Sequence, residues 1–125
     1  MPFQITVPAG PAAPTTARRA LTHWLSVHTT NGLRSDAPLV VSELVTNSLR
    51  HAGLPTTATI RVSAALADGV LRIEVEDGGT SGAIVRREPN RDSSGGFGLN
   101  IIDALALRWG VERANSTLFW VEFGC

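Results

Sequence analysis

The sequence predicts an α+β domain, a two-layer sandwich in which a mixed, mostly antiparallel sheet carries helices on one face. Two segments with an apolar residue at every second position flank Asp68-Gly69, apolar residues recur at helical spacing before them, and the tail after Gly110 alternates again. A chain of 125 residues has the usual size of one domain. Residues 1–125 are therefore expected to form a single unit.

The first half of the chain is expected to form one strand and two helices. Apolar and polar residues alternate over residues 3–7, the pattern of a strand with one buried face. Apolar residues at helical spacing predict a helix over about residues 16–28, capped by one of the threonines at its start. Asp36 followed by Pro38 signals the start of a second helix, expected to end at Ala52.

The middle of the chain predicts a hairpin with a defined register. Asp68-Gly69 suits a two-residue turn between two alternating segments. That turn places three apolar pairs on one side of the sheet: Leu66 with Leu71, Ala64 with Ile73, and Val62 with Val75. It also places Arg61 opposite Glu76 on the other side, a pairing that the apolar pattern does not require.

The second half is expected to form a loop, a helix and two strands. Residues 78–98 are rich in Gly, Ser, Arg and Pro, which predicts the loop. Apolar residues then predict a helix over roughly residues 98–107. Two strands are expected on either side of Asn115 and Ser116, and the alternation there leaves their register open.

Composition narrows the functional classes. Eleven Lys+Arg balance eleven Asp+Glu, so no basic nucleic-acid footprint is visible. All eleven basic residues are Arg, which excludes a P-loop lysine and Schiff-base chemistry. Cys125 is the single cysteine, so no intramolecular disulfide forms. Without a signal peptide or an apolar run of membrane-spanning length, the protein is expected to be cytoplasmic, with no nucleic-acid or membrane partner.

Three polar side chains form one stripe on the second helix. Glu43, Asn47 and His51 are each four residues apart and border its apolar face. A carboxylate at such an edge can accept a proton, and an amide oxygen one turn away can bind Mg²⁺. An ordinary polar helix face in solvent has the same spacing, so the stripe alone leaves both interpretations open.

Asp77 and the glycines after it follow the second strand of the hairpin. Asp77 could accept a hydrogen bond from an exocyclic amine, while Gly79 lets a flat ring approach the backbone. An ordinary turn aspartate is the alternative.

A second glycine-rich segment, Gly95 to Leu99, precedes the third helix. Its backbone N–H groups could converge on an anion, or the segment could be a flexible connector. Three arginines of the loop, Arg86, Arg87 and Arg91, offer charge to phosphates or serve only solubility.

Taken in order, residues 41–52, 75–79, 96–99 and 109–110 resemble the GHKL superfamily of ATPases, which includes DNA gyrase, the ninety-kilodalton chaperones and histidine kinases. Within it, the sequence is most similar to the small anti-sigma factor serine/threonine kinases and their actinobacterial relatives. The resemblance covers nearly the whole chain and implies a Bergerat-type ATP-binding fold. Ser81 stands where the family often has a further glycine, so the start of the lid departs from the pattern.

The resemblance implies a single kinase-like domain with a Mg-ATP site on the open face of the sheet, under a lid at about residues 80–95. Glu43 would be the general base and Asn47 the Mg²⁺ ligand. Asp77 would receive the adenine amine. The other nucleotide-binding residues that it implies are His51, Gly79, Gly96, Phe97, Gly98, Leu99 and Thr117.

The function implied by the resemblance is that of a regulatory kinase. It would bind a sigma factor and transfer the ATP γ-phosphate to Ser or Thr of a STAS-type anti-anti-sigma antagonist. Two alternatives stay open: a nucleotide-dependent protein-binding module without phosphate transfer, and the same fold without a nucleotide. Anti-sigma relatives pair, so a homodimer is also considered, with Phe3 and Trp24 as surface candidates, although both could pack in the core.

Overall fold

The computed structural model describes residues 2–28, 33–51, 58–77, 99–113 and 116–124. In this part of the chain the elements are β1 (Phe3–Pro8), α1 (Ala13–His28), α2 (Leu33–His51), β2 (Thr59–Ala67), β3 (Val70–Glu76), α3 (Leu99–Leu105), β4 (Arg108–Arg113) and β5 (Thr117–Gly124).

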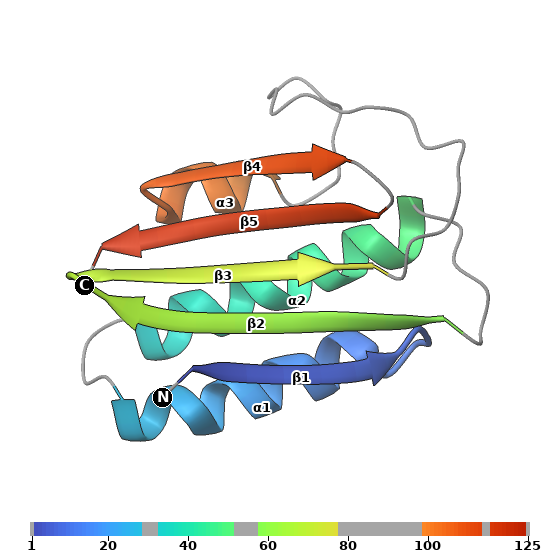
Figure 1. Cartoon of the computed structure of the whole chain (residues 1–125), viewed down its shortest axis with the longest axis horizontal. Helices are drawn as coiled ribbons and strands as arrows, with labels where there is room; N and C mark the ends of the chain where they lie inside the picture. Colours follow the sequence, from blue (N-terminus) through green and yellow to red (C-terminus); the bar gives the residue numbers. More distant parts are fainter. Residues whose placement is uncertain (1, 29–32, 52–57, 78–98, 114–115, 125) are drawn as a thin grey trace.

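The five strands form one sheet in the order β1-β2-β3-β5-β4. Figure 1 shows α1, α2 and α3 together on one face of this sheet, so the chain forms two layers. The predicted α+β class is confirmed. All four pairings among the described strands are antiparallel, so the parallel pair that a mixed sheet would need is not found among them.

The predicted hairpin is confirmed with its register. β2 and β3 pair so that Leu66 lies opposite Leu71 and Arg61 opposite Glu76. Asp68 and Gly69 have φ values of 53° and 78°, as a two-residue turn of the mirror-image type requires. The Arg61 guanidinium also forms an ion pair with the Glu76 carboxylate. The turn residues and the alternation thus specify the same pairing.

Both long helices begin earlier than predicted. α1 starts at Ala13, whose N–H donates to the Gly10 carbonyl at 3.0 Å, so the expected start near residue 16 is wrong. α2 starts at Leu33 rather than at Asp36 and ends at His51. Asp36 therefore lies in the first turn, where a carboxylate suits the positive helix end. Pro38 lies inside the helix. A proline near the start of a helix therefore indicates that start only to within a few residues.

The third helix is shorter than predicted. α3 covers Leu99–Leu105, so it ends before the predicted residue 107, and the predicted start at residue 98 lies outside the described residues. The Ala106 N–H still donates to the Ile102 carbonyl at 2.9 Å, but the Leu107 N–H donates to the Glu122 carbonyl at 2.8 Å. The chain has entered the sheet at that point, because pairing with β5 replaces the next helical hydrogen bond.

The core lies between the helices and the inner face of the sheet, and it settles the register of the tail. Val121 and Phe123 of β5 are buried, so this set faces the helices and Trp120 lies on the outer face. The largest fully buried side chains elsewhere include Leu21, Leu25, Leu44, Ile60, Leu71, Ile73 and Ile102. Among the described residues, the helices are too short or too polar to cross a membrane.

Candidate functional site

The second half of α2 carries two of the predicted site residues. Asn47 is only 2% exposed, whereas Glu43, one turn earlier, is half-buried. α2 packs against β3 and β5, and in Figure 1 the end of α2 lies behind the end of β3 and the start of β5. Asn47 is therefore buried near that end of the sheet, and Glu43 lies at the border of the buried face.

The burial of Asn47 bears on the two interpretations of the polar stripe. A helix face that is merely wet would leave this amide exposed, and it is not. Burying an amide costs free energy unless hydrogen bonds or ligands compensate for it. The interpretation as an ordinary solvent-exposed face therefore does not hold for Asn47.

Asp77 and Thr117 meet where β3 ends and β5 begins. The Asp77 N–H donates to the Thr117 carbonyl at 3.1 Å, and the Thr117 N–H donates to Asp77 Oδ1 at 3.3 Å. The two residues are 4% and 7% exposed. These bonds hold the Asp77 carboxylate at the sheet end and limit its movement. The structure thus brings together two predicted site residues that are 40 positions apart.

The site was predicted to lie on the open face of the sheet, and this is wrong for Asp77 and Thr117. Leu71, Ile73 and Val75 are buried against the helices, and Asp77 continues the same alternation. Thr117 likewise belongs to the inward set of β5 that contains Val121. The described candidate residues therefore lie on the helix side of the sheet, at its end, and not on its open face.

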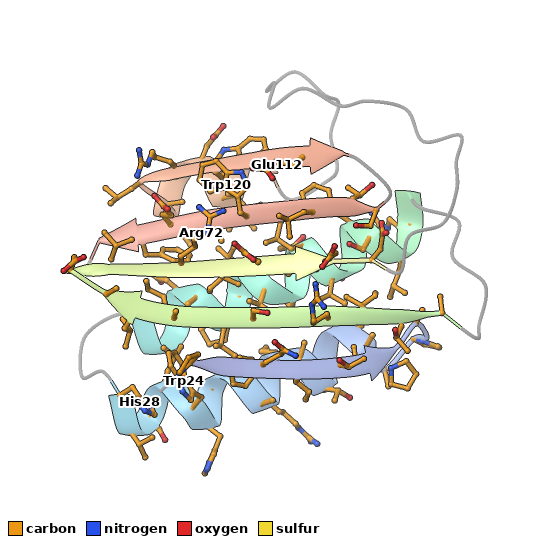
Figure 2. All side chains as sticks on the ribbon, viewed as in Figure 1. Trp24, His28, Arg72, Glu112 and Trp120 are labelled. Carbon is orange, nitrogen blue, oxygen red and sulfur yellow. The ribbon has the colours of Figure 1, made fainter. Side chains whose placement is uncertain are left out.

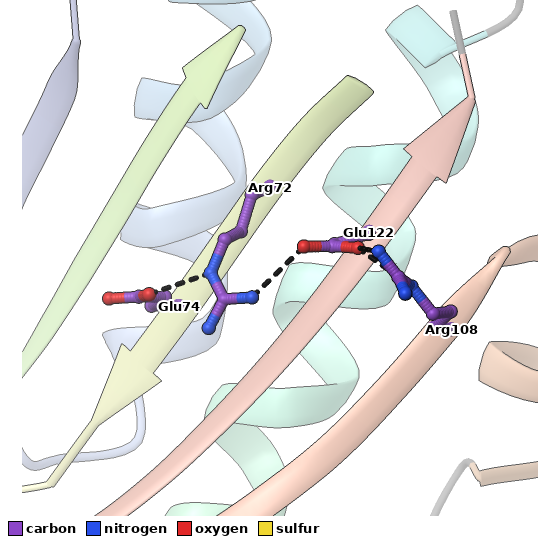
Figure 3. A network of polar contacts seen from close by, with 4 residues as sticks. All are labelled: Arg72, Glu74, Arg108 and Glu122. Carbon is purple, nitrogen blue, oxygen red and sulfur yellow. Dashed lines mark hydrogen bonds and ion pairs between the residues drawn. The ribbon is translucent and has the colours of Figure 1, made fainter. Parts of the chain in front are cut away.

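The open face carries a charged network instead. Arg72 of β3 bonds to Glu74 at 2.8 Å and to Glu122 of β5 at 3.0 Å, and Arg108 of β4 bonds to Glu122 at 2.6 Å. Figure 3 shows these four side chains in a row across the three strands. Arg72 also lies 4.7 Å from the centre of the Trp120 ring, and Figure 2 shows both on the face away from the helices.

This network shifts two pKa values. Hydrogen bonds from Arg108 and Arg72, together with their charges, hold the pKa of Glu122 below its ordinary value despite partial burial. Burial alone would lower the pKa of Arg72, but its bonds to Glu74 and Glu122 outweigh burial and raise it. Both groups therefore stay charged at neutral pH, and the network holds β3, β5 and β4 together.

Other predicted site residues lie outside the described part of the chain. These are Gly79, Gly96, Phe97 and Gly98, together with the lid at residues 80–95 and its arginines. His51 is the last residue of α2 and Leu99 the first of α3, and their backbones alone are described. The roles of all of them stay predictions.

One polar residue near the site was missed by the sequence reasoning. Ser48 is 2% exposed, and its hydroxyl has no hydrogen-bond partner among the described residues. It follows Val41, Leu44 and Val45 at intervals of seven, four and three residues, which places it on the buried stripe of α2. The sequence signal that could have identified Ser48 is a polar residue at the helical spacing of the apolar residues Val41, Leu44 and Val45.

A separate groove lies between β1 and α1, away from these residues. Its lining is mostly apolar: Phe3, Thr16, Arg19, Ala20, His23, Trp24 and Val27. Phe3 and Trp24 contact each other with ring centroids 5.8 Å apart, and Trp24 stacks on His28. Both dimer candidates thus lie at this groove and are partly buried against the core.

The described residues include one oxygen donor of the kind that suits a Mg²⁺ bound mainly by phosphates and water. Asn47 offers a hard amide oxygen near the sheet end, beside the half-buried Glu43. Among the described residues no three His, Cys, Asp or Glu side chains are grouped to hold a metal. Mg²⁺ at nucleotide sites usually has one or two protein ligands, with phosphates and water completing its shell. Asn47 fits that pattern.

A known family model matches most of the chain. The family model described as a histidine kinase-like ATPase domain matches residues 7–119, which includes every described candidate residue from Glu43 to Thr117. No match is found among curated proteins.

Proposed function

The chain belongs to the histidine kinase-like ATPase domain family, and we propose that it is a regulatory serine/threonine protein kinase of the anti-sigma factor type. The family implies an ATP-binding domain. The proposed substrate is a serine or threonine of a STAS-type anti-anti-sigma antagonist, and the proposed regulatory target is a sigma factor. Both come from the sequence resemblance.

One structural observation supports the nucleotide site most strongly. Asn47, a buried amide, belongs to the last turns of α2, and Asp77, a buried carboxylate, directly follows β3, whose end lies near the end of α2 in Figure 1. An acceptor for an exocyclic amine and a hard oxygen ligand for phosphate-bound Mg²⁺ are the two ends of a site for an adenine nucleotide. Neither group is needed for the apolar core, and burying an amide such as that of Asn47 costs free energy unless hydrogen bonds or a ligand compensate for it.

Glu43 is proposed to be the base of the transfer. The hydroxyl oxygen of the acceptor residue bonds to the γ-phosphorus, the bond from that phosphorus to the β–γ bridging oxygen breaks, and ADP leaves with the electron pair. The hydroxyl proton passes to the Glu43 carboxylate, whose half-buried position at the border of α2 leaves it accessible to an acceptor. Mg²⁺, when bound, neutralises phosphate charge, and Asn47 is proposed to hold it.

Transfer of the labelled γ-phosphate from ATP to a purified STAS-domain antagonist tests the proposal. We expect label on the antagonist with the wild-type protein and a loss of about 10² to 10⁴ in rate with Glu43→Gln. Nucleotide binding without transfer to any candidate antagonist would instead favour a nucleotide-dependent binding module. The absence of ADP and ATP binding in the presence of magnesium would exclude both.

The partners are tested separately from the chemistry. Co-purification with a sigma factor in the presence of ATP tests the proposed target. A homodimer across the β1–α1 groove belongs to the same proposal, and light scattering with Val27→Asp tests it, because Val27 is 70% exposed beside that groove. A wild-type monomer at all accessible concentrations would exclude the dimer.

A further inference from the structure

The groove between β1 and α1 borders one continuous face of α1. The lining residues from this helix have the spacing of a single helix face: Thr16, Arg19, Ala20, His23, Trp24 and Val27. The residues that α1 buries in the core belong to a different face: Ala13, Ala17, Leu21 and Leu25. The helix therefore has a second, partly apolar face in addition to the one that packs in the core.

Aromatic contacts hold the apolar part of this groove in place. The rings of Phe3 and Trp24 lie 5.8 Å apart between centroids, and His28 stacks on Trp24 at 4.6 Å. Nδ1 of His28 also lies 2.7 Å from the Trp24 carbonyl oxygen, which accepts its proton in a hydrogen bond. Because Phe3 and His28 restrict the indole, little side-chain entropy is lost when a ligand packs against it.

The charged groups of the groove have one sign. Arg19 and His23 are one helical turn apart, so their side chains lie on the same side of α1. Neither side chain has a hydrogen bond or an ion pair with another described residue. The sequences of α1 and β1 contain no Asp or Glu. An uncompensated arginine suits a carboxylate, which a guanidinium can bind through two parallel hydrogen bonds.

The size of the groove and its charge indicate what could occupy it. Its volume of about 680 Å³ lies in the range of small-molecule sites, which are mostly apolar with a few polar groups. A second copy of the chain matches the charges less well. A two-fold contact places the same patch of both copies face to face, so Arg19 and His23 of each copy would meet without an acidic residue from α1 or β1.

We propose that the β1–α1 groove binds a small amphipathic anion, a carboxylate with an apolar body. The apolar body packs against Phe3, Trp24 and Val27, of which Val27 is 70% exposed without a ligand. The carboxylate accepts hydrogen bonds from Arg19 and His23. This site is separate from the proposed nucleotide site and does not depend on it. The proposed homodimer would use the same groove, so ligand and second copy would exclude each other.

Fluorescence titration with two probes tests the proposal. Anilinonaphthalene sulfonate is an amphipathic anion that becomes bright in apolar surroundings, and phenylnaphthylamine has the same ring system without the sulfonate. We expect Arg19→Gln to bind the anionic probe about 3- to 10-fold more weakly than wild type, because an exposed charge pair is partly screened by solvent. Both proteins should bind the neutral probe equally.

Arg18→Gln is the matched control. Arg18 precedes Arg19 on the same helix and is exposed, but it is not among the residues that line the groove. This variant should bind both probes as wild type does. All three proteins should melt at the same temperature, because neither arginine side chain has an ion pair with another described residue.

Competition tests whether the site takes a carboxylate. Decanoate, below the concentration at which it forms micelles, should displace the anionic probe from wild type and should do so less effectively from Arg19→Gln. Decanol has the same chain without the charge, and it should displace the probe equally from both proteins.

Four results would overturn the inference: no binding of either probe by wild type, equal affinity of wild type and Arg19→Gln for the anionic probe, an equal loss for both probes, or the same loss in Arg18→Gln. Light scattering on the same samples tests the other occupant. A wild-type dimer that excludes the anionic probe at every concentration would show that a second copy fills the groove, and it would also overturn the inference.

Discussion

Asp77 and Thr117 are joined by two backbone-anchored hydrogen bonds, in which each residue's N–H donates to the other, once to the Thr117 carbonyl and once to Asp77 Oδ1. The pair joins the end of β3 to the start of β5, neighbouring strands that are far apart in sequence. A carboxylate held in this way is preorganised, so little conformational entropy is lost when a ligand binds to it.

Asp77→Asn separates the ligand role of this residue from its structural role. An amide oxygen can still accept from the Thr117 N–H, so the melting temperature should change little. The side chain loses its charge and one acceptor, so ADP affinity should fall by about 10- to 100-fold, the range of a charge-assisted hydrogen bond. Calorimetry and thermal melting measure the two effects, and a large loss of stability with unchanged affinity would contradict the assignment.

Glu43→Gln should slow phosphate transfer strongly and leave the affinity for ADP nearly unchanged. The amide cannot take up the proton of the attacking hydroxyl, so the rate of phosphate transfer should fall by about 10² to 10⁴, while ADP affinity stays within about twofold. Glu112→Gln is the matched control, because Glu112 is exposed on the outer face of the sheet. Equal rates for wild type and Glu43→Gln would exclude Glu43 as the base.

Gly110→Ala should destabilise the protein through Trp120. A Cβ at residue 110 would lie 2.8 Å from Cζ2 of the Trp120 indole, which is too close for a carbon contact. The expected loss is about 1–3 kcal/mol in the free energy of unfolding, measured with urea.

The same substitution in a Trp120→Leu background provides the control. Without the indole, Ala in place of Gly in a strand should be neutral or should stabilise by about 0.5–1 kcal/mol. An equal loss in both backgrounds would show that Trp120 is not the cause.

Glu122→Gln should change how stability depends on pH. The pKa of Glu122 is lowered in the folded state, chiefly by hydrogen bonds from Arg108 and Arg72. Its contribution is therefore fully present above the ordinary pKa of 4.5 and is lost as the pH falls through the lower folded value.

The measurement is the free energy of urea unfolding of both proteins from neutral pH to acid. The wild-type advantage over Glu122→Gln should be constant at neutral pH and should shrink below about pH 4.5. Curves that stay parallel throughout the acid range would contradict the coupling.

The amino-acid sequence was sufficient for features that depend on neighbours in the chain. Asp68-Gly69 and the alternation around it determined the hairpin register, including Arg61 opposite Glu76, because turn geometry and the alternation of side chains act over a few residues. The α+β class followed from the same local patterns.

Features that depend on distant contacts were decided by the tertiary structure alone. Large side chains occupy both sets of alternate positions in β5, so the sequence does not show which set faces the core. Packing against the helices buries the set with Val121 and Phe123 and leaves Trp120 on the outer face. The burial of Asn47 and Ser48, and the side of the sheet on which Asp77 lies, also require α2 to pack on β3 and β5. Helical spacing places polar residues on one side of a helix, but burial depends on what packs against that side, and here those strands follow α2 in the chain.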